Sequence, residues 1–185
     1  MSNPKEPDKV KLISSLFSPK KEIIENVILQ FSKVFGPVDW TSPELLFDRT
    51  RYYAEEMGWP LYRRFISFSK LISADHLSEI KLNTNRVEQQ YLSDEKRTVN
   101  IDPGYISAER LVLATGKNYS HRIYLSKGIF ADLTLLFQRG HFETLKWTYP
   151  DYADQKVIAF FYEIRKKYIK QLKELRQFDK KYDCI

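Results

Sequence analysis

The residues best suited to phosphate chemistry lie in the segment LVLATGKNYSHRIYL, residues 111–125, which contains the pair Gly116-Lys117. A phosphate-binding P-loop has the pattern G-x-x-x-x-G-K-[ST], follows a strand and opens a helix, because its backbone N–H groups and lysine must surround the phosphates. In this chain Leu111 occupies the first glycine position, and Asn118 stands where Ser or Thr is required. The pattern therefore excludes a P-loop in this segment.

The same segment has the pattern of a β-hairpin. Alternating apolar residues flank Gly116-Lys117-Asn118, which are residue types favoured in turns. Such a hairpin gathers Lys117, His121 and Arg122 near one edge of a sheet, where three donors could hold a phosphate or a carboxylate. A solvated hairpin tip is the alternative. If the protein is an enzyme, His121 is the candidate for proton transfer, because the unperturbed pKa of histidine lies near neutrality.

The segment NIDPGYIS places Asp102 directly before Pro103-Gly104. Pro at the second and Gly at the third position are typical of a type II turn, and an Asp at the start of the turn accepts backbone N–H groups. The turn could be purely structural, or it could direct Asp102 and Tyr105 at a ligand held by the hairpin. Asp102 is therefore the second catalytic candidate.

Asp132 lies in the apolar segment IFADLTLLF, where strand alternation predicts a half-buried side chain. A half-buried carboxylate needs a partner, and Arg122 or His121, one strand away, could supply it. We expect a structural ion pair in preference to acid–base catalysis. In the segment WTYPDY we expect Tyr149 to cover a pocket mouth or the edge of the core, and Asp151 to cap the last helix.

Arginine stands beside aromatic residues in the segments RTRYY and YRRF, a combination used to bind RNA bases and phosphates. Arg64, in the second segment, is expected to be an outer contact of a ligand. The ligand-binding candidates are thus Arg64, Tyr105, Lys117, Arg122, Asp132 and Tyr149, and the catalytic candidates are His121 and Asp102.

Length and composition predict one globular domain. The 185 residues are 43% hydrophobic and 15% aromatic, which is enough for a sizeable core. The net charge is +6, and residues 163–185 contain eight basic but only four acidic residues. This basic segment could bind RNA or an anionic surface; the alternative is that it forms the solvated face of a last helix.

Several kinds of site and compartment are excluded or disfavoured. A single cysteine, Cys184, excludes disulfides and a cysteine-based metal site within the chain. The histidines lack the paired spacing of zinc ligands, so we expect neither a metal nor another cofactor. No apolar run approaches the ~18 residues of a membrane span, and the first residues lack the apolar stretch of a signal peptide. We therefore expect a cytoplasmic protein with no membrane partner.

Hydrophobic periodicity predicts an α+β fold with a ferredoxin-like βαββαβ core. An antiparallel hairpin would extend the sheet, the helices would pack on one face, and a long helix would end the domain. The four core strands are expected at residues 10–18, 38–48, 61–72 and 97–107. The expected divisions of the chain are a flexible arm at residues 1–9, one domain at residues 10–178 and a tail at residues 179–185.

The segments RTVNIDPGYISAERLVLATGKNYSHRIYLSKGIFADLTL and WTYPDY resemble a bacterial and archaeal family of small single-domain proteins of unknown function. The resemblance extends over nearly the whole chain, including KLNTN and the pair Tyr52-Tyr53. It implies a fold family and no mechanism. Some members carry the label "GTP-binding protein", but this chain has neither a P-loop nor the N-K-x-D guanine motif.

The sequence leaves three functions open. The first is binding of an anionic small molecule, a nucleotide or a phosphorylated metabolite, at an edge of the sheet. The second is an RNA-binding or ribonucleoprotein-associated module that uses the basic C-terminal helix. The third is a structural or interaction protein that forms a homodimer through its aromatic surface. Whether the protein is an enzyme is left open as well.

Overall fold

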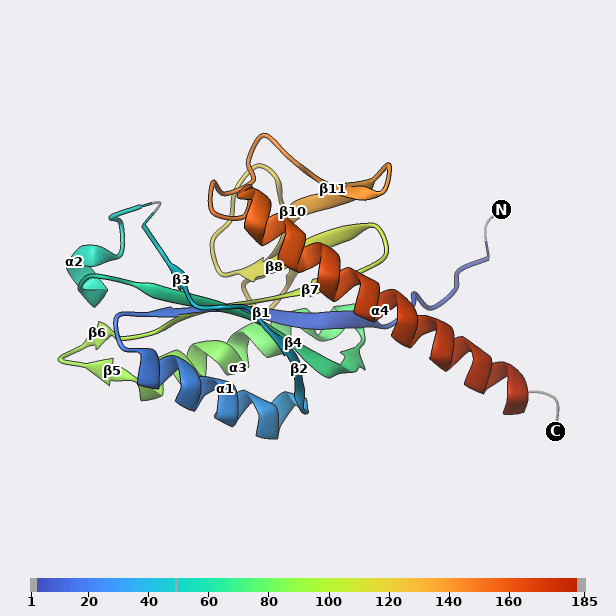
Figure 1. Ribbon diagram of the computed structural model, residues 1–185, viewed down its shortest axis with the longest axis horizontal. Coiled ribbons are helices and arrows are strands. Elements are labelled where there is room, and N and C mark those ends of the chain that lie inside the picture. Colours follow the sequence, from blue (N-terminus) through green and yellow to red (C-terminus); the bar gives the residue numbers. More distant parts are fainter. Residues whose placement is uncertain (1–2, 49, 183–185) are drawn as a thin grey trace.

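A computed structural model describes residues 3–48 and 50–182, with side chains up to residue 178. A nine-stranded antiparallel sheet forms its centre, and helices cover both faces of the sheet (Figure 1). The α+β prediction is confirmed. Cys184 and Arg49 lie outside the described residues.

The strand order of the sheet is β11-β10-β8-β7-β1-β4-β2, with β3 beside β4 and β9 beside β10. The strands are β1 (Val10–Ser18), β2 (Val38–Thr41), β3 (Leu45–Leu46), β4 (Tyr62–Ile72), β7 (Asn100–Ile106), β8 (Arg110–Thr115), β9 (Arg122–Ser126), β10 (Ile129–Gln138) and β11 (His141–Thr144). A separate two-stranded sheet consists of β5 (Leu92–Ser93) and β6 (Lys96–Arg97). The helices are α1 (Lys21–Phe35), α2 (Ala54–Met57), the short 3-10 helix η1 (Ala74–His76), α3 (Leu77–Gln90) and α4 (Gln155–Tyr182).

Strand β1 is buried along its whole length, and both of its faces carry large apolar side chains. Leu12 and Leu16 pack in the core that α1 and α3 cover. Ile13, which points to the opposite face, packs in a second core with Phe161 and Ile164 of α4. The expectation that the helices pack on one face is therefore wrong: α1 and α3 lie on one side and α4 on the other (Figure 1). A strand with large apolar side chains on both faces needs a cover on both faces.

The predicted type II turn at Asp102 is also wrong, because residues 102–105 lie inside strand β7. Pairing of β7 with β1 runs through Pro103 to Asn100. Pairing of β7 with β8 stops at Gly104, opposite Leu113. Proline has no N–H group to donate, and the β7–β8 ladder ends at the residue that follows Pro103. Beyond this point the two strands separate.

The predicted hairpin between β8 and β9 does not form, because β10 lies between these two strands. The four buried residues of β8, from Leu111 to Ala114, need a partner strand that is itself largely buried. The long strand β10 fits this place, whereas β9 exposes Ile123 and Tyr124 and occupies the outer edge. The true hairpin joins β9 to β10, and residues 116–121 cross over β10 instead.

At Gly104 strand β8 lies too close to β7 to leave room for a side chain. A Cβ atom added there would lie 2.4 Å from the backbone oxygen of Val112, which cannot move without breaking the sheet. We expect Gly104→Ala to lower the free energy of unfolding by about 2–3 kcal/mol and Tm by roughly 5–10 °C, measured by thermal and urea denaturation. The control is Gly116→Ala, where the added Cβ meets open space. Equal Tm values for the two variants would contradict the proposed constraint.

Candidate functional site

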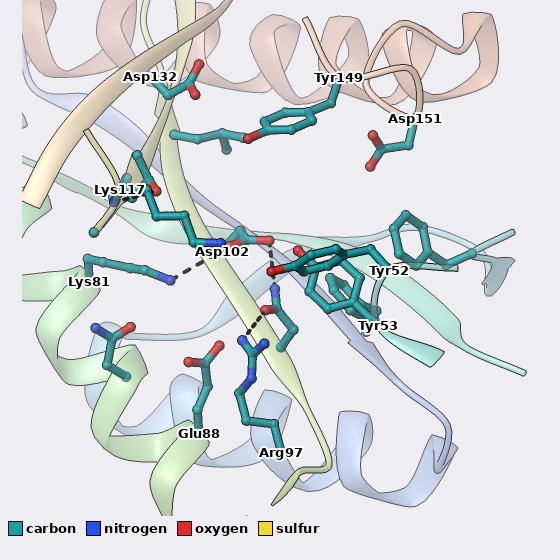
Figure 2. Close-up of a pocket in the computed structure, with 18 of the residues that line it drawn as sticks. Tyr52, Tyr53, Lys81, Glu88, Arg97, Asp102, Lys117, Asp132, Tyr149 and Asp151 are labelled. Atoms are coloured by element: carbon teal, nitrogen blue, oxygen red, sulfur yellow. Dashed lines mark hydrogen bonds and ion pairs between the residues drawn. The ribbon is translucent and has the colours of Figure 1, made fainter. Parts of the chain in front are cut away.

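A cavity of about 870 Å³ opens where β7 and β8 separate (Figure 2). Helix α3 and strand β7 form one side of it, and the loop after β8 together with residues 149–152 forms the other. Tyr52 and Tyr53 close a third side. The volume lies in the range of small-molecule binding sites.

The floor of the cavity is a polar cluster around β7 (Figure 2). The ammonium of Lys81 donates to the backbone oxygen of Ile101 at 2.8 Å, and it lies 3.7 Å from Oδ1 of Asp102. Oδ2 of Asp102 accepts a hydrogen bond from the side-chain amide of Asn100 at 2.8 Å. Oε1 of Glu88 accepts the backbone N–H of Ile101 at 2.5 Å. Each carboxylate of the floor thus has one oxygen engaged in a hydrogen bond within the protein.

Burial raises the pKa of several groups that line the cavity, among them Glu88 and Tyr53. It raises the pKa of Glu88, an effect that the nearby ammonium of Lys81 opposes but does not cancel. It also raises the pKa of Tyr53 to about 12. The Tyr53 hydroxyl therefore keeps its proton at neutral pH and can donate a hydrogen bond into the cavity.

Two arginines in the wall of the cavity are held by carboxylates. Nε and Nη2 of Arg97 each donate to one carboxylate oxygen of Glu56 at 2.6 Å, which is the bidentate arrangement that arginine favours. Arg63 forms an ion pair with Asp151, and the centre of its guanidinium lies 4.0 Å from the centre of the Phe47 ring. Both guanidinium groups are therefore already paired with a carboxylate of the protein.

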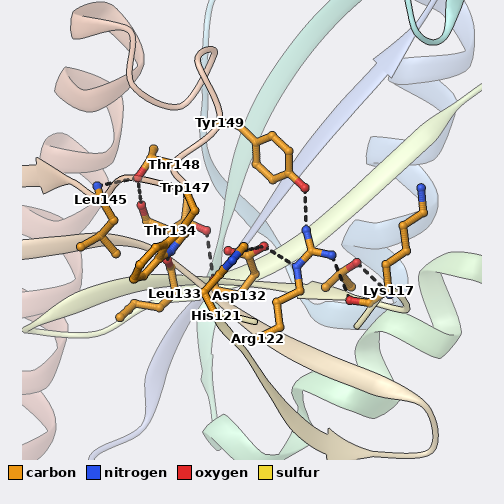
Figure 3. Close-up of polar contacts among 11 residues, drawn as sticks. Lys117, His121, Arg122, Asp132, Leu133, Thr134, Leu145, Trp147, Thr148 and Tyr149 are labelled. Carbon is orange, nitrogen blue, oxygen red and sulfur yellow. Dashed lines mark hydrogen bonds and ion pairs between the residues drawn. The ribbon is translucent and has the colours of Figure 1, made fainter. Parts of the chain in front are cut away.

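A network around Asp132 fixes the loop of residues 116–121 (Figure 3). The carboxylate of Asp132 is buried, and its Oδ2 accepts a 2.8 Å hydrogen bond from Nε of Arg122. Nε2 of His121 lies 3.4 Å from the same oxygen. Arg122 also donates to the backbone oxygen of Lys117 at 2.9 Å and to the hydroxyl of Tyr149 at 2.7 Å. The expected ion pair of Asp132 is present, and it ties the loop to the segment before α4.

Lys117 differs from the other cations of the cavity. Its ammonium lies 5.6 Å from the centre of the Tyr52 ring, and it forms no ion pair with a carboxylate within residues 3–48 and 50–178. The remaining cations of the lining each lie within 4 Å of a carboxylate: Arg63, Lys81, Arg97 and Arg122. A cation at the mouth of a cavity without a carboxylate partner is available to an anionic ligand.

The structure brings together five of the eight residues proposed from the sequence: Asp102, Lys117, Arg122, Asp132 and Tyr149 line the cavity. His121 stands outside the lining, and its ring stacks on that of Trp147 with centres 4.9 Å apart. Arg64 points away and pairs with Glu25 at 3.1 Å. Tyr105 packs in an apolar cluster beside α3. These three residues do not share the site.

Sequence reasoning missed the residues that α3 contributes. Lys81, Asn85 and Glu88 follow one another at spacings of four and three, so they lie on one face of the helix. This polar stripe runs beside the buried residues Thr84 and Val87. A polar stripe next to an apolar stripe was a usable signal, because polar side chains at the border of a core either bind each other or line a cavity.

Asp151 does not cap the last helix as predicted. Helix α4 begins at Gln155, and Asp154 takes the capping position: its Oδ1 accepts the backbone N–H of Lys156 at 2.9 Å. Asp151 lies four residues before the helix and pairs with Arg63 instead. Its place in the wall of the cavity follows from that pair.

Within residues 3–48 and 50–182, no three His, Cys, Asp or Glu side chains are grouped so that they could hold a metal ion. In that same part of the chain, no helix is both long and apolar enough to cross a membrane.

Residues 8–168 match the model of the family DUF4416, a domain of unknown function. The chain belongs to this family. The match contains every residue that lines the cavity, from Phe17 to Tyr152, so the site lies wholly within the family domain. No curated protein and no solved structure matches the chain significantly.

The Asp132–Arg122 pair should contribute strongly to stability, because both side chains are buried. Asp132→Asn leaves the guanidinium of Arg122 buried without its counter-charge, and we expect a loss of about 3 kcal/mol in the free energy of unfolding. Amide hydrogen exchange in residues 116–121 should become faster, since the loop loses its anchor. Glu79→Gln, which removes the exposed Lys127–Glu79 pair, is the control and should leave urea unfolding unchanged. A stability loss of similar size in both variants would contradict the special role of Asp132.

The raised pKa of Glu88 predicts a pH-dependent stability. Between the ordinary and the raised pKa the folded state binds the proton more tightly, so stability falls as pH rises through this window. Glu88→Gln keeps an acceptor for Ile101 but cannot ionise. Its Tm should exceed that of the natural protein at about pH 8. The two Tm values should be equal at about pH 3, where Glu88 is protonated in both the folded and the unfolded state. A difference in Tm that does not change with pH would contradict this assignment.

Proposed function

We propose that this protein binds a small phosphorylated molecule, a nucleotide or a phosphorylated metabolite, in the cavity between α3 and the loop of residues 116–121. The observation that carries the proposal is the ammonium of Lys117, which stands at the cavity without a carboxylate partner within residues 3–48 and 50–178. The Tyr52 ring beside it offers a face on which a planar group could stack.

The charge of the lining supports an anionic ligand. Five cationic side chains and four carboxylates of the described chain face the cavity. One of these carboxylates is Glu88, whose raised pKa favours the neutral form. Because the site is partly closed, its charges act through a lower effective dielectric than water, which strengthens the attraction for a phosphate.

We also propose that six elements of the first 106 residues form a ferredoxin-like unit. The proposal is supported by their order along the chain, β1, α1, β2, β4, α3 and β7, and by the adjacency of these four strands in the sheet. The cavity lies at the border between this unit and the strands that extend it, β8 to β11.

The RNA-binding alternative and the dimer alternative stay predictions. In the described part of α4, many basic side chains already form hydrogen bonds or ion pairs within the protein. Five of them do so: Arg165, Lys166, Lys167, Lys170 and Arg176. Exposed apolar residues on β9 are compatible with a homodimer, but they favour no particular partner. Neither alternative has an observation of the strength of the Lys117 site.

A binding measurement with Lys117→Ala tests the proposed function. Nucleoside monophosphates and sugar phosphates should raise the Tm of the natural protein at low salt, and the variant should bind the same ligand about 10- to 100-fold more weakly, the usual effect of losing a charge-assisted hydrogen bond. The control is Lys170→Ala, whose ammonium is exposed on α4 far along the chain from the cavity.

The outcomes separate the alternatives. Equal affinity of Lys117→Ala and the natural protein would refute the assignment of this site. A Tm shift with short RNA alone, steeply reduced by salt, would favour the RNA-binding alternative. A concentration-dependent mass in analytical ultracentrifugation without any ligand effect would favour the structural alternative.

A further inference from the structure

The acidic floor of the cavity has hydrogen-bonding capacity that a phosphate cannot use. A carboxylate has about four acceptor positions. Asp102 receives one hydrogen bond, from Asn100, and Glu88 receives one, from the backbone of Ile101. Oδ1 of Asp102 lies 3.7 Å from the ammonium of Lys81, which is longer than a hydrogen bond. Both groups line the cavity and are at least half-buried, so their remaining acceptors call for a donor from a ligand or from water.

The ammonium of Lys81 determines which kind of ligand donor can bind Asp102. A ligand ammonium at Asp102 would be repelled by Lys81, whose own ammonium is held there by the backbone oxygen of Ile101. A neutral hydroxyl meets no such repulsion. It can donate to Oδ1 of Asp102 and at the same time accept an N–H of Lys81, because a hydroxyl has one donor and two acceptor positions. Two neighbouring hydroxyls of a ligand could form hydrogen bonds with both Asp102 and Lys81.

Lys117 and the floor of the cavity therefore favour different parts of one molecule. Lys117, in the loop after β8, is available to a phosphate, whereas the carboxylate of Asp102 on the floor repels a phosphate. Figure 2 shows Asp102, Lys81 and Glu88 along β7 and α3, with Tyr52 and Tyr53 beside them. The Tyr53 hydroxyl, which keeps its proton, adds a further neutral donor to this region.

We propose that the ligand is a phosphorylated polyhydroxy compound, a sugar phosphate or a nucleotide, whose neighbouring hydroxyls bind Asp102 and Lys81 while its phosphate binds Lys117. The phosphate half of this inference rests on the proposed function. The hydroxyl half rests on the open acceptors of Asp102 and on the ammonium beside it. Asp102 is thus assigned as the residue that distinguishes a sugar phosphate from a simple phosphomonoester.

The test compares ligands with and without hydroxyls by isothermal titration calorimetry at low salt. The probes are ribose 5-phosphate, a hexose 6-phosphate and a nucleoside 5′-monophosphate, with methyl phosphate as the phosphomonoester that has no hydroxyl. At least one of the first three should bind tenfold or more tightly than methyl phosphate. Asp102→Asn should remove about 10- to 100-fold of that affinity, because a hydrogen bond to a charged group is lost. Its affinity for methyl phosphate should be unchanged or higher, because a negative charge has gone.

Controls separate this inference from the proposed function. Asp75→Asn alters an exposed carboxylate outside the cavity and should bind every probe as the natural protein does. Circular dichroism melting of Asp102→Asn checks that the fold is kept; the amide still offers an acceptor to Asn100. If methyl phosphate binds through Lys117 and no hydroxyl-bearing probe binds more tightly, the hydroxyl inference is overturned and the phosphate site stands. If no phosphorylated probe binds at all, both are overturned.

Discussion

The separation of β7 from β8 at Gly104 is the constraint on which the site depends. Pro103 has no N–H group for a further ladder bond, and pairing between the two strands ends at the next residue. Residues that would have faced each other across the sheet, Asp102 on β7 and Thr115 on β8, line the cavity instead. Where the two strands are still paired, Gly104 has no side chain to collide with the backbone of β8. One dipeptide thus ends a sheet interaction and opens a binding space.

The loop of residues 116–121 depends on a second constraint, the burial of Asp132. Asp132 is buried in strand β10. In the described chain, the only side chains that pair with its carboxylate are those of Arg122 and His121. Those residues lie at the end of the crossover loop, so neutralising the buried charge also fixes the loop. Arg122 then reaches Lys117 and Tyr149 through the same guanidinium. Folding energetics and placement of the site are therefore coupled.

The cavity combines two chemical environments that are unusual for one small site. Among the described residues, every cation of the lining except Lys117 lies within 4 Å of a carboxylate. Its floor has carboxylates with open acceptors beside a fixed ammonium. A single simple ion cannot satisfy both regions. A ligand with an anionic group at one end and neutral donors at the other can, and membership in DUF4416 leaves this chemistry open.

The sequence by itself determined the elements with strong periodicity: β1 and β4 lie within or close to the ranges that their patterns predict, and the long last helix is present as α4. It also identified Arg122 as a partner of Asp132, because a half-buried carboxylate requires one. The tertiary structure alone decided the place of Asp102 in a strand and the insertion of β10 between β8 and β9. Local turn chemistry favours a turn at Pro103-Gly104, but pairing with the buried strand β1 outweighs that preference. The side chains of α3 that complete the cavity share no sequence neighbourhood with the loop, and only packing of the helix on β7 brings them together.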